Sequence, residues 1–301
     1  MKDHLDLKAY AKINLGLDVV RKREDGYHEV RMIMQTVNLY DRIEMDRTED
    51  GVIRTETNLP FVPDGEGNLA WRAAKLLLDE KGIKDGVTIK IRKYIPVAAG
   101  MAGGSTGSAD AAATIHAMDA LFSLGLSLEE KQKIGVKLGA DVPYCIMRGT
   151  ALSEGIGEIL TELPAPPQCH LVIAKPQISV STKAVYGKLR VNELAPEEHP
   201  DIDGMMAAIK NGDLDGVIER LGNVLETVTV PDHPEIAEIK EIMVENGACG
   251  SLMSGSGPTV FGIYKDRELA EKACQALREA DGGRLTRQVY LTEFYNRKKA
   301  R

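Results

Sequence analysis

A glycine-rich segment near the middle of the chain has the composition of a phosphate-binding loop. Its glycines, Gly100, Gly103, Gly104 and Gly107, follow a predicted strand and precede an alanine-rich run at residues 109–113. Glycine lets backbone N–H groups approach a ligand without an intervening side chain, and the N-terminus of the following helix attracts anions. The segment could hold a phosphate group, or it could be a flexible strand-to-helix turn.

Two familiar nucleotide-binding patterns do not fit this segment. No Lys-Ser or Lys-Thr pair closes it, so it is not a Walker sequence. Ala102 occupies the position of the second glycine in a Gly-x-Gly-x-x-Gly fingerprint. A Rossmann-type oxidoreductase is therefore poorly supported.

A lysine near the start of the chain stands among apolar residues. Lys12 and Asn14 would face one side of a predicted strand. The apolar residues Ile13, Leu15 and Leu17 would face the other side. Lys12 could be a half-buried cation near phosphate groups, or a lysine on the wet face of an edge strand.

Tyr27 and His28 follow a predicted turn at residues 23–26. An aromatic ring beside an imidazole on a loop could stack on, and hydrogen-bond to, a flat polar ligand such as a base. The pair could also close a hairpin, and taken alone it favours that simpler interpretation.

Two further turns carry polar groups. Asp141 stands in Gly-Ala-Asp-Val-Pro at residues 139–143, where it could orient or deprotonate a hydroxyl nucleophile or belong to a plain turn. A second glycine loop, Ser-Gly-Ser-Gly-Pro, occupies residues 254–258. It could present backbone amides to a phosphate group or connect two strands tightly.

The composition is that of a soluble globular protein. The chain has 301 residues, 43% of them hydrophobic, and a net charge of -7, so no global attraction to nucleic acid or an anionic membrane is expected. The four cysteines form no Cys-x-x-Cys pair, which argues against a zinc site. No signal-peptide core or apolar run of about 18 residues occurs, so we expect a cytoplasmic protein. We also expect a monomer or a homodimer.

Residue patterns predict a mixture of strands and helices, typical of an α+β protein. In the first half we expect strands of one antiparallel sheet at residues 5–20, 31–39, 41–46 and 52–57, a strand at 87–94, and helices at 69–80, 109–121 and 128–138. A proline-rich linker at residues 163–167 follows. Beyond it we expect a strand at 170–175, helices at 202–210, 214–221 and 234–246, and strand, turn, strand, helix and strand over 250–294.

The order of these features resembles that of the GHMP small-molecule kinase superfamily. A lysine on the first strand, a central glycine loop, the turn at 139–143 and the loop at 254–258 occur in that order. Shorter segments are similar to the members that act on a cytidine diphosphate alcohol: residues 11–15, 25–28, 67–69, 139–143, 154–158 and 176–182. The resemblance extends from about residue 9 to about residue 261 and thins between residues 190 and 240.

The resemblance implies an α+β fold of two domains. Residues 1–163 would form an ATP-binding domain with a mixed sheet and helices, residues 164–301 an α/β sandwich, and the active site would lie in the cleft between them. ATP and Mg²⁺ would be the cofactors. The reaction would be phosphorylation of the 2-hydroxyl of a cytidine diphosphate derivative of methylerythritol, in the non-mevalonate route to isoprenoids. The alternatives are a sibling kinase for mevalonate, homoserine or a sugar, and a nucleotide-binding homologue with impaired catalysis.

The resemblance also implies roles for single residues in the transfer of a phosphoryl group. Lys12 and Asp141 would be the catalytic pair. Asp141 would accept or orient the proton of the 2-hydroxyl, and Lys12 would stabilise charge on the transferred group. Ser105 would lie near the magnesium ion.

Further residues would bind the two substrates. Tyr27 and Tyr186 would sandwich the cytosine, His28 would hydrogen-bond to its edge, and Asn14 would contact the erythritol. The second loop would flank the phosphate groups with Gly255, Ser256 and Gly257. ATP would be bound by Asn68, Pro96, Val97, Ala98, Ala99, Gly100, Met101, Ala102, Gly103, Gly104, Ser105 and Thr106.

One departure from the superfamily follows the glycine loop. Members generally pass from Gly-Gly-Ser-Ser or Gly-Gly-Ser-Thr almost directly into Asp-Ala-Ala-Ala or Asn-Ala-Ala, whereas residues 107–109 intervene here between Thr106 and Asp110. Three extra residues inside a helix would rotate it by about 300° and lengthen it by roughly 4.5 Å. We therefore expect them to extend the loop or to add a first helical turn capped by Ser105 or Ser108.

Overall fold

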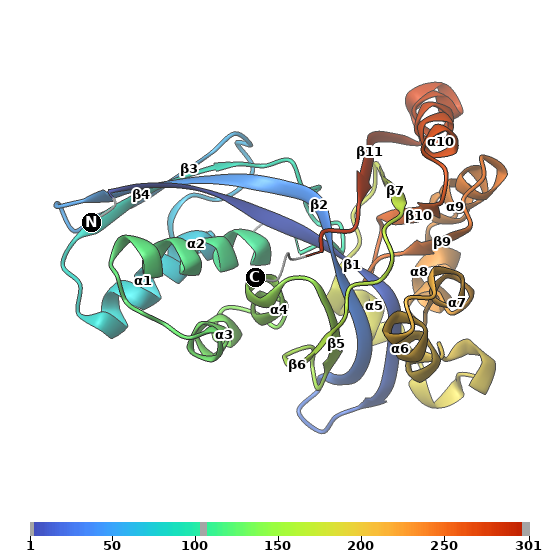
Figure 1. The fold of residues 1–301 in the computed structure, drawn as a ribbon, viewed down its shortest axis with the longest axis horizontal. Helices are drawn as coiled ribbons and strands as arrows, with labels where there is room; N and C mark the ends of the chain where they lie inside the picture. The colour runs from blue at the N-terminus through green and yellow to red at the C-terminus, as the bar shows by residue number, and fades with distance from the viewer. Residues whose placement is uncertain (1–2, 103–106, 297–301) are drawn as a thin grey trace. The chain divides into compact units, whose positions relative to one another are not determined.

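The computed structural model describes residues 3–102 and 107–296, which form two compact units that interleave along the chain (Figure 1). The first unit contains Met1–Ala11, Leu39–Val97 and Ala102–Arg148. The second unit contains Lys12–Asn38, Ala98–Met101 and Gly149–Arg301. The sequence predicted two domains divided at residue 163. Each unit of the structure is instead made of several separate segments, so it does not test that division, which stays a prediction.

The strands of the first unit form a mixed sheet. Residues 42–48 of β2 (His28–Thr48) pair antiparallel with β4 (Gly86–Arg92), and β3 (Ile53–Thr57) pairs with β4 in parallel. The expectation of a separate strand at 41–46 in an all-antiparallel sheet is therefore wrong. The connection from β3 to β4 contains helix α1 (Leu69–Lys81), and a crossover of that length brings the chain back in the same direction.

Helix α1 confirms the prediction of a helix at residues 69–80. Asn68 caps its N-terminus by accepting a hydrogen bond from the Ala70 N–H at 2.9 Å, and left-handed Gly82 ends it. Its buried residues recur at helical spacing: Leu69, Ala70, Ala73, Ala74, Leu77 and Leu78. Together with α2 (Ser108–Leu121), α3 (Leu128–Val136) and α4 (Val142–Met147), it lies on one side of the sheet (Figure 1).

Helix α2 follows the glycine loop and is buried on nearly every side, as its run of alanines allows. It begins at Ser108, so two of the three extra residues, Ser108 and Ala109, lie in its first turn and Gly107 precedes it. The expectation of a Ser108 cap is wrong, because Gly107 is the N-cap and no side chain of the described residues caps the helix there. Ser105, the other expected cap, lies outside the described residues.

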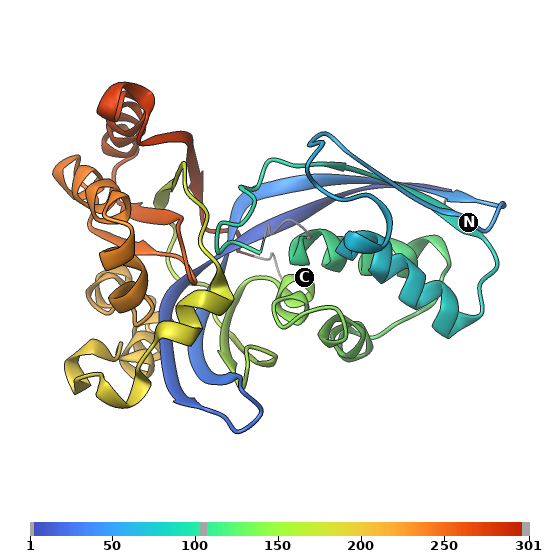
Figure 2. The ribbon, with the colours of Figure 1, turned by 180° about the vertical axis from the view of Figure 1, so that it is seen from behind.

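The C-terminal half of the second unit contains a sheet in the order β11-β7-β10-β9, with every neighbouring pair antiparallel. Its strands are β7 (His170–Pro176), β9 (Gly250–Met253), β10 (Val260–Tyr264) and β11 (Thr286–Glu293). Helices α9 (Glu235–Glu245) and α10 (Arg267–Glu279) pack against it (Figure 2). The predicted order over residues 250–294 is confirmed, and residues 254–258 join β9 to β10.

Residues 12–22 of β1 (His4–Lys22) belong to the second unit. Strand β1 lies between β2 and β8 (Gly222–Asn223). Strand β5 (Thr150–Glu154) pairs with β2 and with β6 (Ile159–Leu163). The helices here are α5 (Thr182–Lys188), α6 (Ile202–Lys210), α7 (Leu214–Glu219) and α8 (Glu226–Asp232). Short 3-10 turns occur at Gly65–Gly67 in the first unit and at Val191–Glu193, Pro196–Glu198 and Ala280–Gly283 in the second.

The four cysteines are free thiols, of which Cys145, Cys169 and Cys274 are buried and Cys249 is exposed. Within residues 3–102 and 107–296, no helix combines the length and the apolar character needed to span a bilayer.

Candidate active site

Lys12 and Asn14 lie in the core of the second unit. Lys12 is 4% exposed and Asn14 is 0% exposed, because β1 runs between two other strands rather than at an edge. Lys12 Nζ donates to Asn14 Oδ1 at 2.7 Å and to the Gly100 carbonyl oxygen at 3.0 Å. The interpretation of Lys12 as a lysine on a wet edge strand is therefore excluded.

The Gly100 carbonyl oxygen is also the point where the two glycine loops meet. It accepts a second hydrogen bond, from Ser254 Oγ at 3.1 Å. The same hydroxyl oxygen accepts from the Asn14 N–H at 3.3 Å, and Ser254 is fully buried. Strand β1, residues 98–101 and the second loop are thus joined at one place, which we call the Gly100 junction.

The Gly100 junction requires glycine in both loops. A Cβ on Gly100 would lie 2.2 Å from the Ser254 backbone oxygen, and one on Gly255 would lie 3.2 Å from the Gly100 oxygen. Both glycines are left-handed, with φ of 68° and 59°. These positions therefore depend on glycine for close approach as well as for backbone conformation.

A buried asparagine that the sequence patterns did not single out fixes the second loop. Asn223 Nδ2 donates to the carbonyl oxygens of Met253 and Gly255, each at 2.8 Å. Thr229 Oγ1 donates to the Ser256 carbonyl oxygen at 3.3 Å. The loop is thereby held from β8 and α8 as well as by its own strands.

The first loop alternates in handedness over its described part. Ala98, Gly100 and Ala102 have φ of 51°, 68° and 61°. Left-handed residues at every second position are typical of anion-binding nests, in which successive N–H groups converge. A left-handed conformation costs an alanine about 1–2 kcal/mol. Contacts with the surrounding residues must therefore stabilise the loop. Gly103, Gly104, Ser105 and Thr106 lie outside the described residues.

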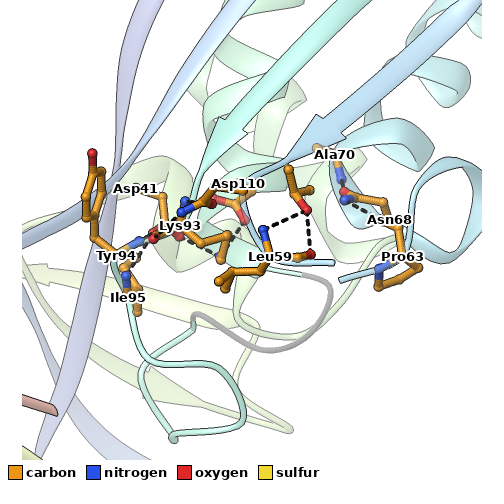
Figure 3. A network of polar contacts seen from close by, with 11 residues as sticks. Asp41, Leu59, Pro63, Asn68, Ala70, Lys93, Tyr94, Ile95 and Asp110 are labelled. Carbon is orange, nitrogen blue, oxygen red and sulfur yellow. Dashed lines mark hydrogen bonds and ion pairs between the residues drawn. The ribbon is translucent and has the colours of Figure 1, made fainter. Parts of the chain in front are cut away.

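Several predicted ATP-binding residues have structural contacts of their own. Ala99 and Met101 are buried, so only their backbone groups could face a ligand. Asn68 is 2% exposed; its Oδ1 caps α1 and its Nδ2 donates to the Pro63 carbonyl oxygen at 3.0 Å (Figure 3). Contacts of Asn68, Pro96 and Val97 with ATP stay predictions.

Asp141 stands at the N-terminus of α4 in the first unit. Val142 and Pro143 open the helix after it, and the Asp141 carbonyl oxygen accepts from the Cys145 N–H at 3.0 Å. Within the described chain its carboxylate makes no capping hydrogen bond to this helix. Asp141 and Lys12 belong to different units, so their joint action on one substrate stays a prediction.

Two of the predicted cytosine-binding residues lie together in the second unit. The ring centroids of His28 and Tyr186 are 5.1 Å apart, with the planes tilted by 44°. Burial lowers the pKa of His28, and the positive charge of Lys22 lowers it further. This favours a neutral imidazole that can accept one hydrogen bond and donate another.

Tyr27 combines a hairpin role with an exposed ring. Its N–H donates to Asp25 Oδ1 at 3.1 Å and its carbonyl oxygen accepts from the Arg23 N–H at 2.8 Å, so the backbone closes the turn. The side chain is 61% exposed. The sandwich of cytosine between Tyr27 and Tyr186 stays a prediction.

Helix α5, which carries Tyr186, is tied to the second glycine loop. The hydroxyl oxygens of Thr182 and Ser256 are 2.8 Å apart, a hydrogen-bond distance. In the second unit, the helix that carries Tyr186 and the loop that carries Ser256 are therefore linked by a direct side-chain contact.

Two segments of the chain match known families. Residues 68–149 match the GHMP kinases N terminal domain, and residues 205–282 match the GHMP kinases C terminal domain. The first match includes the glycine loop and Asp141, and the second includes residues 254–258.

Similar proteins extend over nearly the whole chain. A 4-diphosphocytidyl-2-C-methyl-D-erythritol kinase of Lachnospira eligens is 53% identical, covering 97% of this chain and 99% of its own. A kinase of the same name from Lachnoclostridium phytofermentans is 52% identical, covering 98% and 99%. A crystal structure of 4-(cytidine 5'-diphospho)-2C-methyl-D-erythritol kinase is 32% identical with a TM-score of 0.81, covering 97% of this chain and 100% of that one.

Replacing Gly100 with alanine should disrupt the Gly100 junction. The new Cβ would lie 2.2 Å from a backbone oxygen, so the backbone of one loop must move. We expect the affinity for ATP, measured by isothermal titration calorimetry, to fall by at least about tenfold, or about 1.4 kcal/mol.

Gly125→Ala is the matched control. Gly125 has a φ of 67°, and no atom of the described residues lies within 4 Å of an added Cβ. This substitution should lower Tm through backbone strain of about 1–2 kcal/mol and leave the ATP affinity unchanged. An unchanged ATP affinity in Gly100→Ala would contradict the role of the junction.

Proposed function

The chain belongs to the GHMP kinase family, and we propose that it phosphorylates the 2-hydroxyl of 4-diphosphocytidyl-2-C-methyl-D-erythritol with ATP. The observation that carries the proposal is the set of full-length relatives, about half identical, that bear the name of this activity. The expected α+β fold and the expected ATP-dependent kinase activity are confirmed by the family and structural matches. The reaction is a step in non-mevalonate isoprenoid precursor synthesis.

The Gly100 junction supports the proposal that Lys12 acts in this reaction. Phosphoryl transfer depends mainly on positioning and on stabilising the charge of the transferred group. Asn14 and the Gly100 carbonyl fix the Lys12 ammonium beside residues 98–101. We assign to Lys12 the stabilisation of the transferred phosphoryl group, with the ATP phosphates along residues 96–106 and the amides of residues 255–257 flanking them.

Asp141 is the proposed partner of the acceptor hydroxyl. A carboxylate within hydrogen-bond distance of the 2-hydroxyl can orient it and take its proton as the new bond forms. The short helix that begins after Asp141 fixes its backbone, since the Asp141 carbonyl oxygen accepts from the Cys145 N–H.

The proposed metal is Mg²⁺, which would neutralise charge on the ATP phosphates. Magnesium usually binds through substrate phosphates and only one or two protein oxygens. In the part of the chain that the structure describes, no group of three His, Cys, Asp or Glu side chains could hold a metal. This fits an ion that arrives with ATP, and Ser105 stays its proposed protein ligand.

We propose that the kinase selects its substrate by recognising the cytosine base. His28 and Tyr186 present a neutral imidazole and an aromatic ring side by side, which suits the polar edge and the flat face of cytosine. Asn14 would contact the erythritol. A cytoplasmic location and a monomeric or homodimeric state are proposed with this function.

Turnover with different alcohols tests the substrate. In a coupled ADP-release assay, the purified kinase should use 4-diphosphocytidyl-2-C-methyl-D-erythritol far better than mevalonate or homoserine. Tyr186→Ala should raise KM for the cytidine substrate about tenfold or more, because base–aromatic stacking contributes about 1–3 kcal/mol. Tyr40→Ala, which removes a tyrosine that packs against Tyr10, should leave that KM unchanged. Preference for an alcohol without cytidine would refute the substrate.

Asp141→Asn tests the role of the carboxylate. The variant keeps the shape of the side chain and loses its charge, so kcat should fall by about 10²–10⁴ while ATP affinity stays within about twofold. Asp79→Asn breaks an exposed ion pair with Lys75 on α1 and should change neither quantity. A kcat of Asp141→Asn close to that of the wild type would show that the carboxylate plays no part in the transfer.

A further inference from the structure

A buried cluster of three charged side chains lies in the first unit, and we call it the loop clasp. Lys93 Nζ donates to Asp41 Oδ2 at 2.5 Å and to Asp110 Oδ2 at 2.7 Å (Figure 3). The side chains of Lys93, Asp41 and Asp110 are 1%, 0% and 4% exposed. Lys93 lies three positions before the first residue of the glycine loop at 96–106, and Asp110 lies four positions after the last.

Asp41 holds the chain where it enters the loop. Its second oxygen, Oδ1, accepts from the N–H groups of Tyr94 at 2.5 Å and Ile95 at 2.8 Å. Asn58 adds to this, since its Oδ1 accepts from the Lys93 N–H at 2.7 Å. The three residues before Pro96 are thus fixed by side chains from outside β4.

Asp110 holds the chain where it leaves the loop. Its carboxylate folds over Gly107, since a Cβ at Gly107 would lie 2.1 Å from Asp110 Oδ2. The Ala109 N–H also donates to the Ala102 carbonyl oxygen at 3.2 Å. Gly107 and Ala109 are two of the three residues by which this chain departs from the superfamily pattern.

The electrostatics of the loop clasp are costly for the fold. Burial raises the pKa of Asp110 to about 7; the ammonium of Lys93 opposes this shift and the charge of Asp41 adds to it. Burial alone would lower the pKa of Lys93, but Asp110 and Asp41 outweigh it and the pKa rises. Within the described residues Asp110 Oδ1 has no hydrogen-bond partner. A buried ionic cluster of this kind adds little net stability, which favours a role in fixing geometry.

We propose that Asp41, Lys93 and Asp110 are positioning residues that hold the two ends of the glycine loop at the spacing that ATP requires. They act on ATP through the loop backbone and not by touching the reacting atoms. The inference rests on the proposed binding of the ATP phosphates by residues 96–106.

Isosteric variants test the loop clasp in the intact enzyme. Asp41→Asn and Asp110→Asn each remove a charge and keep the shape of the side chain. We expect each to raise KM for ATP about tenfold, since each loses an ionic hydrogen bond that fixes one loop end. The kcat and the KM for the alcohol should stay within about twofold, a split that a general loss of folded enzyme would not produce.

Two further substitutions separate position from stability. Lys131→Met breaks a partly buried ion pair with Asp119 of α2, also 2.7 Å long and in the same unit, and should lower Tm without changing KM for ATP. Gly107→Ala leaves the charges in place and displaces the Asp110 carboxylate, so it should raise KM for ATP as Asp110→Asn does.

The Gly100→Ala variant separates failure of the loop clasp from failure of the ATP assignment. If Gly100→Ala raises KM for ATP while folded Asp41→Asn, Asp110→Asn and Gly107→Ala do not, the loop clasp is only structural and the inference is overturned. If none of the four variants changes KM for ATP, residues 96–106 do not bind the phosphates, and the inference and its premise both fail. Should an Asn variant not fold, Gly107→Ala decides by the same criterion.

Discussion

The carbonyl oxygen of Gly100 accepts hydrogen bonds from the Lys12 ammonium and the Ser254 hydroxyl, and the site in the second unit depends on this double contact. The contact can form because no side chain stands at residue 100 and because Ser254 is fully buried against it. The cation, the first loop and the second loop cannot move independently while the Gly100 junction holds. A phosphate group bound there would meet N–H groups and a positive charge already in place, which reduces the cost of ordering them.

The glycine loop is held in two different ways along its length. Its middle residues, 98–101, belong to the second unit and are fixed by hydrogen bonds to one carbonyl. Its flanking residues belong to the first unit and are fixed by a buried ionic cluster centred on Lys93. Ala98 and Ala102 have left-handed backbone conformations, which alanine disfavours. Such conformations persist where contacts with the surrounding structure fix the loop.

Sequence patterns identified the residues whose types are chemically distinctive. Lys12 and the two glycine loops were selected from residue type and order, and the Gly100 junction brings them together. Sequence patterns missed four buried polar residues, namely Asp41, Lys93, Asp110 and Asn223. The sequence does not distinguish a buried charged or amide side chain from one on the surface. Lys93 and Asp41 are 52 positions apart, and the closeness of the Asp110 carboxylate to Gly107 depends on how the Asp110 side chain folds. Such pairings arise only from the tertiary arrangement.

A crystal structure with a non-hydrolysable ATP analogue and the cytidine diphosphate alcohol bound would test the central claim most directly. The account predicts the γ-phosphoryl group within hydrogen-bond distance of Lys12 Nζ, at about 2.7–3.2 Å, and the acceptor hydroxyl at a similar distance from the Asp141 carboxylate. A phosphate tail bound away from the Gly100 junction, with Lys12 and Asp141 on separate surfaces, would contradict it.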